Sequence, residues 1–317
     1  MKLLKYSLFF ALLIIITGCK LSMTDTGAVP PGEHFLELYS HTTQTSVSRL
    51  KVRGDILFSL ETIGLVAYDA STSNGLTLMG YYPLIADCFD ISGDFAYLGG
   101  ENLTILNISD PFNIIEVSNN SFGRISDIIV SGQLAFIADV DFGYRILDVT
   151  NDNAVYETAF GCTAVGTRRI ELEYPYLLGI YPDGVWISDI HDPYNPVEIG
   201  EFPLSYGVSL AVNANYLYAL TESRLLAVDI SNPSTPTQIG AFSFWIDNQD
   251  IQLYGTQAII VTSGELIAID ISNPGSLKEI DRFYINNSTI TSLTMCANDI
   301  YTAEGVNGIR LVRYWSN

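Results

Sequence analysis

The chain has 317 residues, of which 48% are hydrophobic and only 16% charged, and its formal net charge is −20. This composition favours a folded protein with a large buried core over a disordered chain. Acidic side chains outnumber basic ones by 35 to 15, which argues against a nucleic-acid partner, because binding phosphates requires a basic surface.

The first 18 residues have the pattern of a secretory signal peptide. Lysines at positions 2 and 5 precede an apolar run over residues 8–16, and small residues then lead to Cys19. The run is too short to remain as a transmembrane helix. The sequence ITGC at 16–19 resembles the lipobox of bacterial lipoproteins, which implies cleavage of residues 1–18 and lipid modification of Cys19. An ordinary signal peptide with a cysteine nearby by chance is the alternative.

This resemblance implies where in the cell the protein resides. We expect an exported bacterial lipoprotein that is anchored in a membrane through its lipid alone, with residues 19–32 as a flexible tether rich in Ser, Thr, Gly and Pro. Lys20 directly after the cysteine favours the outer membrane or the cell surface. The other cysteines (Cys88, Cys162 and Cys296) show no CxxC spacing, so we expect free thiols and no zinc or redox site.

One pattern recurs through the rest of the chain. LLAVDISNPSTPTQIGAF begins at Leu225 and returns as LIAIDISNPGSLKEIDRF from Leu266 and as VWISDIHDPYNPVEIGEF from Val185. Looser copies begin at 65, 103 and 144, and a truncated copy, GIRLVRYW, begins at 308. The Asp or Asn that ends the leading strand of each copy stands at 69, 107, 148, 189, 229 and 270. A period of about 40 residues in a β-rich sequence is typical of a β-propeller.

Each repeat reads as four short strands, for example at 210–212, 216–220, 225–230 and 238–242. First strands begin near Arg49, Cys88, Asp127, Arg169, Ser209, Asp250 and Ser292. The last repeat lacks a fourth strand, and residues 34–39 supply one, with Tyr39 aligned to the phenylalanines at 202, 242 and 283. We therefore predict an all-β fold over residues 33–317, a seven-bladed β-propeller of four-stranded blades closed by the N-terminal strand. Six blades with extra strands is the alternative.

The strands LLAVD at 225–229, LIAID at 266–270 and YRILD at 144–148 resemble the LVIVD repeat family. The resemblance implies an exported or surface-attached bacterial propeller. It implies little about activity, because most members of this family have no assigned reaction.

The first strands of a propeller line its central channel, so we expect a ligand site at the channel mouth. The aligned starts place two acids and two bases there, Asp127, Asp250, Arg49 and Arg169. These four side chains either bind a polar ligand or form a neutralised lining.

The loops between second and third strands contain acidic and aromatic residues. Acids occur in every repeat, at Glu61, Glu101, Asp139, Asp141, Asp183, Glu222, Glu265 and Glu304. They either converge on Ca²⁺, for which Asp139 and Asp141 come nearest to a motif, or are solvated surface groups. Tyr206 and Trp245 lie in neighbouring loops, where they either stack on a sugar or cover the core.

No catalytic motif is present: the sequence contains no GxSxG, Walker A or GxGxxG pattern. We therefore predict a monomeric binding or scaffold protein for an unknown protein or a surface glycan, without a metal or cofactor. A hydrolase or lyase that acts on polysaccharide with two carboxylates at the channel mouth is the alternative.

Overall fold

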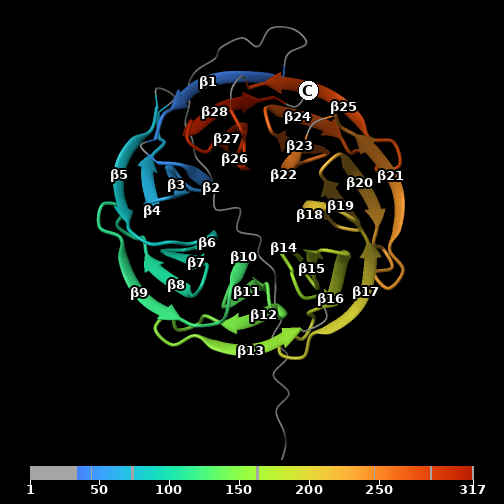
Figure 1. Cartoon of the computed structure of the whole chain (residues 1–317), viewed down its shortest axis with the longest axis horizontal. Coiled ribbons are helices and arrows are strands. Elements are labelled where there is room, and N and C mark those ends of the chain that lie inside the picture. Colours follow the sequence, from blue (N-terminus) through green and yellow to red (C-terminus); the bar gives the residue numbers. More distant parts are fainter. Residues whose placement is uncertain are drawn as a thin grey trace, which may run out of the picture.

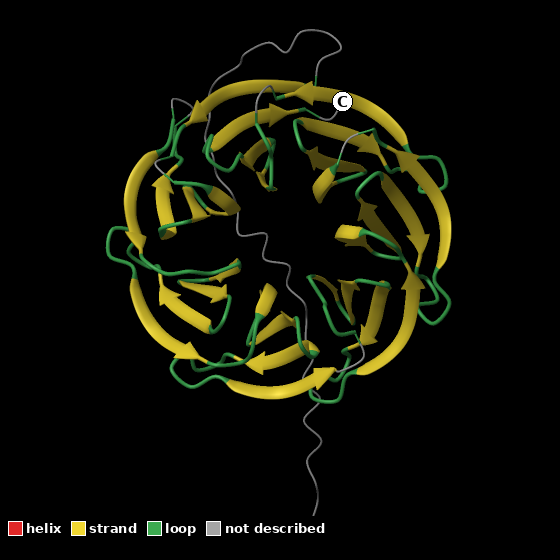
Figure 2. Ribbon diagram, in the orientation of Figure 1, coloured by secondary structure: helices red, strands yellow, loops and turns green. Residues whose placement is uncertain are grey.

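The computed structural model describes residues 34–43, 45–72, 75–161, 164–245, 247–285 and 288–315. Within these ranges the secondary structure is entirely β, with 28 strands in seven four-stranded antiparallel sheets. The sheets stand as blades in a ring (Figure 1), and no helix interrupts them in the described part of the chain (Figure 2). The fold is the predicted seven-bladed propeller.

The blades follow one another in chain order. The first blade consists of β2 (Val47–Arg53), β3 (Ile56–Glu61), β4 (Gly64–Asp69) and β5 (Thr77–Tyr82). The second consists of β6 (Cys88–Ser92), β7 (Phe95–Gly99), β8 (Leu103–Asn107) and β9 (Ile115–Asn120). The third consists of β10 (Ile125–Ser131), β11 (Leu134–Asp139), β12 (Gly143–Asp148) and β13 (Tyr156–Gly161). The fourth consists of β14 (Arg169–Glu173), β15 (Tyr176–Tyr181), β16 (Gly184–Asp189) and β17 (Val197–Pro203).

The remaining blades complete the ring. The fifth consists of β18 (Gly207–Asn213), β19 (Tyr216–Thr221), β20 (Arg224–Asp229) and β21 (Thr237–Ser243). The sixth consists of β22 (Asn248–Tyr254), β23 (Gln257–Thr262), β24 (Glu265–Asp270) and β25 (Lys278–Tyr284). The seventh joins β26 (Ser292–Cys296), β27 (Asp299–Ala303) and β28 (Ile309–Tyr314) to the N-terminal strand β1 (Phe35–His41).

The core lies between the blades. The two middle strands of each blade are buried almost throughout, as in β23 and β24, because a neighbouring blade covers each of their faces. Between the fifth and sixth blades, for example, Leu220 and Leu225 share a cluster with Ile260 and Ile267. Complete burial of one such side chain stabilises the fold by about 1.5–3 kcal/mol. The repeated aliphatic strands therefore hold adjacent blades together.

The Asp that ends each third strand forms the turn that follows it. The Asp229 carboxylate accepts a hydrogen bond from the Ser231 amide at 2.8 Å, and Asp69, Asp148, Asp189 and Asp270 do the same two residues on. Asn107 keeps the turn with its side-chain oxygen. The seventh blade departs from the pattern, because Arg313 at this position pairs with Asp299 instead.

The N-terminal strand closes the ring as predicted, since β1 pairs antiparallel with β28. The register differs from the sequence alignment by two residues. Phe242 lies opposite Leu225, and the equivalent position, opposite Ile309, is occupied by His41 and not by Tyr39. A shift of two leaves every side chain on the same face of the sheet, so alternation alone does not reveal it.

The cysteines differ from the expectation at one position. Cys88 is a free thiol and is buried. Cys296 is disulfide-bonded, so the expectation of free thiols is wrong there. Cys19 and Cys162 lie outside the described residues, as do the signal peptide and the tether.

Candidate functional site: the central channel and its mouth

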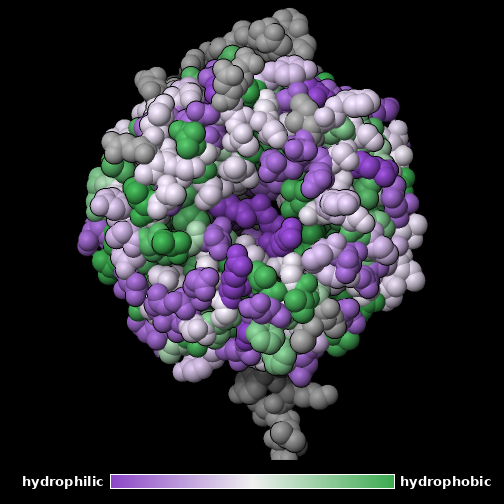
Figure 3. All heavy atoms as spheres, in the orientation of Figure 1, coloured by the Kyte–Doolittle hydropathy of each residue, from purple (hydrophilic) through white to green (hydrophobic). Residues whose placement is uncertain are grey.

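The inner strands enclose a cavity of about 620 Å³ on the ring axis, within the range of small-molecule sites. Hydrophilic side chains gather around the central opening (Figure 3). The structure brings all the predicted first-strand residues to its wall, namely Arg49, Cys88, Asp127, Arg169, Ser209, Asp250 and Ser292.

A second layer of polar side chains, which the sequence reasoning missed, lies two residues further along the same strands. Lys51, Asp90, Glu171 and Gln252 also line the cavity. Side chains at i and i+2 of a strand share one face. The alignment that located the first layer therefore contained the signal for the second.

Channel carboxylates connect neighbouring blades. Asp90 accepts a hydrogen bond from the Val130 amide of the next blade at 2.8 Å, and Asp127 accepts one from the Ile170 amide at 3.1 Å. Asp90 also forms an ion pair with Lys51 of the preceding blade at 2.9 Å. These carboxylates therefore hold inner strands in place.

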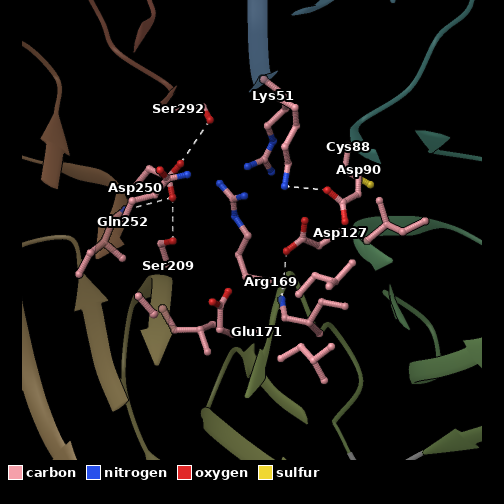
Figure 4. A pocket seen from close by; sticks show the side chains of 18 of the residues that line it. Lys51, Cys88, Asp90, Asp127, Arg169, Glu171, Ser209, Asp250, Gln252 and Ser292 are labelled. Carbon is pink, nitrogen blue, oxygen red and sulfur yellow. Dashed lines mark hydrogen bonds and ion pairs between the residues drawn. The ribbon is translucent and has the colours of Figure 1, made fainter. Parts of the chain in front are cut away.

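Asp250 also connects neighbouring blades, and it accepts hydrogen bonds from more donors than Asp90 or Asp127. Its carboxylate accepts hydrogen bonds from Ser209 Oγ at 2.9 Å and from Ser292 Oγ at 3.3 Å, which belong to the blades on either side (Figure 4). The Leu293 amide adds a longer contact of 3.4 Å.

Two carboxyl groups of the cavity have different pKa values. Burial raises the pKa of Asp127 to about 6, against the lowering effect of the nearby Arg49 charge. Burial, together with the Asp127 charge, raises the pKa of Glu171 to about 8. Glu171 is therefore mostly protonated at pH 7 whereas Asp127 is mostly ionised. The pKa of Lys51 is raised by the Asp90 charge, so this ion pair persists at neutral pH.

Several acids at the channel mouth are not solvated but buried and paired with arginines. Asp139 is fully buried, pairs with Arg145 Nε at 2.6 Å and accepts hydrogen bonds from two loop amides. Glu265 and Glu304 are likewise buried and pair with Arg282 at 2.5 Å and Arg310 at 2.6 Å. In the described ranges, no group of three or more His, Cys, Asp and Glu side chains is arranged to hold a metal ion.

Of the remaining predicted site residues, three lie on the outer surface of the mouth and not in the cavity. Asp141 is exposed in the β11–β12 loop. Tyr206 is 74% exposed and Trp245 is 97% exposed in the loops that enter the fifth and sixth blades. Asp139, although close to Asp141 in sequence, points into the third blade toward Arg145. The structure thus separates the predicted set into a channel group, a surface group and the buried Asp139.

Among the loops, exposed large apolar side chains are more numerous at this mouth than at the opposite end of the ring. The loops that connect consecutive blades and those that join second to third strands lie at the same end of the ring, which we call the mouth face. Large apolar side chains exposed in these loops are Ile63, Ile85, Phe142, Val165, Tyr206, Trp245 and Val306. The loops of the opposite face expose only Phe112, Tyr174 and Tyr194 among the described residues.

Four stretches of the chain match a known repeat family. Residues 85–121, 122–157, 206–243 and 247–284 match the LVIVD repeat, and these stretches contain the second, fifth and sixth blades and the first three strands of the third. No curated protein matches the chain.

Solved structures share the fold. The designed protein Ika8 superposes with a TM-score of 0.64 at 12% identity, over 88% of this chain and 99% of Ika8. A functionally unknown protein from Desulfotomaculum acetoxidans DSM 771 gives 0.65 at 15% identity, over 78% of this chain and 87% of its own. BamB from Moraxella catarrhalis gives 0.64 at 13% identity, over 90% and 93%. At these identities the likeness shows the fold alone.

Proposed function

For this propeller, which carries LVIVD repeats, we propose a role as a membrane-anchored binding or scaffold protein that docks a protein partner on its mouth face. The observation that carries the proposal is the asymmetry of exposed apolar side chains, seven in the mouth loops against three in the loops of the opposite face. Large exposed apolar groups gathered on one face are typical of interaction sites. Loops on rigid blades present such groups without disturbing the core.

The chemistry of these side chains favours a protein over a glycan. Four of them are aliphatic, Ile63, Ile85, Val165 and Val306, and Ile85 is 93% exposed. Sugars stack on flat aromatic faces, whereas a branched aliphatic side chain is buried by the packed core of a protein interface. Tryptophan, the residue at position 245, is among the residue types that are enriched at binding hot spots.

One aromatic side chain is already oriented for contact. The Arg145 guanidinium carbon lies 4.9 Å from the centre of the Phe142 ring, and Arg145 is itself fixed by Asp139. A side chain held before binding loses less conformational entropy when the partner arrives.

The proposed membrane attachment rests on the ITGC sequence and Cys19. In this proposal the mature protein begins at the lipidated Cys19, is carried by the tether at residues 19–32, and resides at the outer membrane or cell surface. No helix in the described ranges is long and apolar enough to cross a membrane. Replacement of Cys19 by Ser should abolish incorporation of labelled palmitate. Equal labelling of both forms would refute the anchor.

Site-specific photo-crosslinking in the native host tests the docking face. A crosslinking amino acid placed at Ile85, Val165 or Trp245 should capture one and the same protein. The matched positions Phe112 and Tyr194, which are 69% and 57% exposed on the opposite face, should not. Equal capture from both faces would contradict the proposal. Glycan-array binding that is lost in Trp245→Ala would replace the protein partner with a sugar.

A second candidate, the polysaccharide hydrolase or lyase, rests on one observation. Glu171 and Asp127 line the same cavity and interact electrostatically, with Glu171 protonated near neutral pH. Binding is favoured because Asp127 and Asp250 already accept hydrogen bonds from the blades and Asp139 is buried against Arg145. Release of reducing ends from a polysaccharide, abolished in Glu171→Gln, would support the enzyme.

A further inference from the structure

Two arginines in the channel differ from the other described arginines that are at least half-buried. Arg53, Arg145, Arg282, Arg310 and Arg313 each form an ion pair with an acid. Arg124, Arg168 and Arg224 are exposed to solvent. Arg49 and Arg169 are half-buried in the cavity wall, yet no hydrogen bond or ion pair joins either guanidinium group to another described residue.

The acids that lie near these arginines are used elsewhere. Asp90 is engaged by Lys51 and the Val130 amide, and Asp250 by two serine hydroxyls. Figure 4 shows Arg169 extending from β14 into the middle of the cavity, between Asp250 on one side and the Lys51–Asp90 pair on the other. The unused hydrogen-bonding groups of the cavity therefore include the guanidinium N–H donors of Arg49 and Arg169, beside the carboxyl group of Glu171.

We propose that Arg49 and Arg169 form a binding site for a small organic carboxylate inside the channel. A guanidinium group presents its N–H donors in a planar fork that matches the two oxygens of a carboxylate. The cavity of about 620 Å³ has room for a ligand of monosaccharide size. This site does not depend on the docking face, because its residues lie in the channel and not in the mouth loops.

The charges on the cavity wall favour a singly charged carboxylate over a phosphate. Its cations are Arg49, Lys51 and Arg169, and its acids are Asp90, Asp127, Asp250 and Glu171, of which Glu171 has a pKa raised to about 8 by burial. A wall that carries acids beside its cations tolerates one added negative charge better than the two of a phosphate, which the aspartates repel. A divalent cation is disfavoured, because the aspartate oxygens already accept hydrogen bonds.

Calorimetric titration of the full-length protein with D-glucuronate, and with glucose as its uncharged counterpart, tests the site. We expect glucuronate to bind, glucose not to bind, and inorganic phosphate to bind more weakly than glucuronate. Loss of a charge-assisted hydrogen bond in Arg169→Gln should weaken glucuronate binding by about 10-fold or more. Arg168→Gln is the matched control, because this neighbouring arginine is exposed, and its affinity should equal that of the parent protein.

A second measurement covers the case in which a channel variant fails to fold. Glucuronate should slow the modification of Arg49 and Arg169 by phenylglyoxal in the unmutated protein, as mapped by mass spectrometry, and should not slow that of Arg168. The proposal is overturned if glucuronate does not bind, if phosphate binds more tightly, or if Arg168 and Arg169 respond alike. A negative result for the carboxylate site would not contradict the docking proposal, because crosslinking from the mouth loops does not involve these arginines.

Discussion

The buried ion pair between Arg310 and Glu304 allows a sharp test of what stabilises the closing blade. Glu304 has a side-chain exposure of 1% and pairs with Arg310 Nε at 2.6 Å and Nη2 at 3.1 Å. Arg310 also reaches Glu37 of the N-terminal strand at 2.7 Å. One guanidinium group thus joins a buried acid of the β27–β28 loop to the strand that closes the ring.

Replacing Arg310 by Met should lower the free energy of unfolding by about 3–5 kcal/mol, because it leaves a buried carboxylate without its partner. The lower end of this range is favoured, since Ser288 Oγ at 2.6 Å and Thr302 Oγ1 at 3.1 Å still donate to Glu304. The further change Glu304→Gln removes the buried charge and should recover part of the loss.

Urea unfolding followed by circular dichroism measures these differences from the transition midpoints at constant slope. Asp94→Asn is the control, since its pairing with Arg53 is largely exposed and should cost less than about 1 kcal/mol. If Arg310→Met costs no more than this control, the buried pair does not stabilise the blade and the reasoning fails.

Two further predictions concern the closing turn and the channel. Gly308 has a φ of +90°, and a Cβ there would lie 2.1 Å from the His41 carbonyl oxygen. Gly308→Ala should therefore lower stability by more than about 1 kcal/mol and by more than Gly54→Ala, whose site is open; an equal loss in thermal melts would contradict the close approach. Glu171 has a folded-state pKa of about 8 against an ordinary value of 4.5, so its contribution to stability is complete below the lower value and is lost as pH rises through 8. The urea midpoint should fall between pH 6 and pH 9 and fall less in Glu171→Gln; an unchanged pH dependence would count against the burial of this carboxyl group.

The fold and the first layer of the channel could be predicted because the repeat is periodic. Alternation along a strand fixes which side chains face the axis, and the period of about 40 residues aligns them between blades. The missing fourth strand of the last repeat predicted the closure by β1, which the pairing of β1 with β28 confirms.

The parts that could not be predicted depend on partners from other strands. Asp139 occurs in a loop sequence that suggests a solvated acid or a calcium ligand. Its burial depends on Arg145, which lies on the facing strand β12 and also pairs with Glu157 of β13. The same three-part arrangement recurs at Arg282, with Glu265 and Glu279. Whether an acid in such a loop is buried depends on the side chains packed around it, which the repeat pattern does not predict.

The blade shared by both ends of the described chain imposes an order on assembly. His34 accepts a hydrogen bond from the Trp315 amide at 2.9 Å and donates its own amide proton to Asp281 at 2.8 Å. These contacts join the strand that comes first among the described residues to elements that come much later in the chain. Until β28 is available to pair, β1 has no partner, and the incomplete row of blades has an open sheet edge. The unclosed ring is therefore the state most exposed to aggregation, and variants that weaken closure should lower the yield of folded protein more than their equilibrium stability suggests.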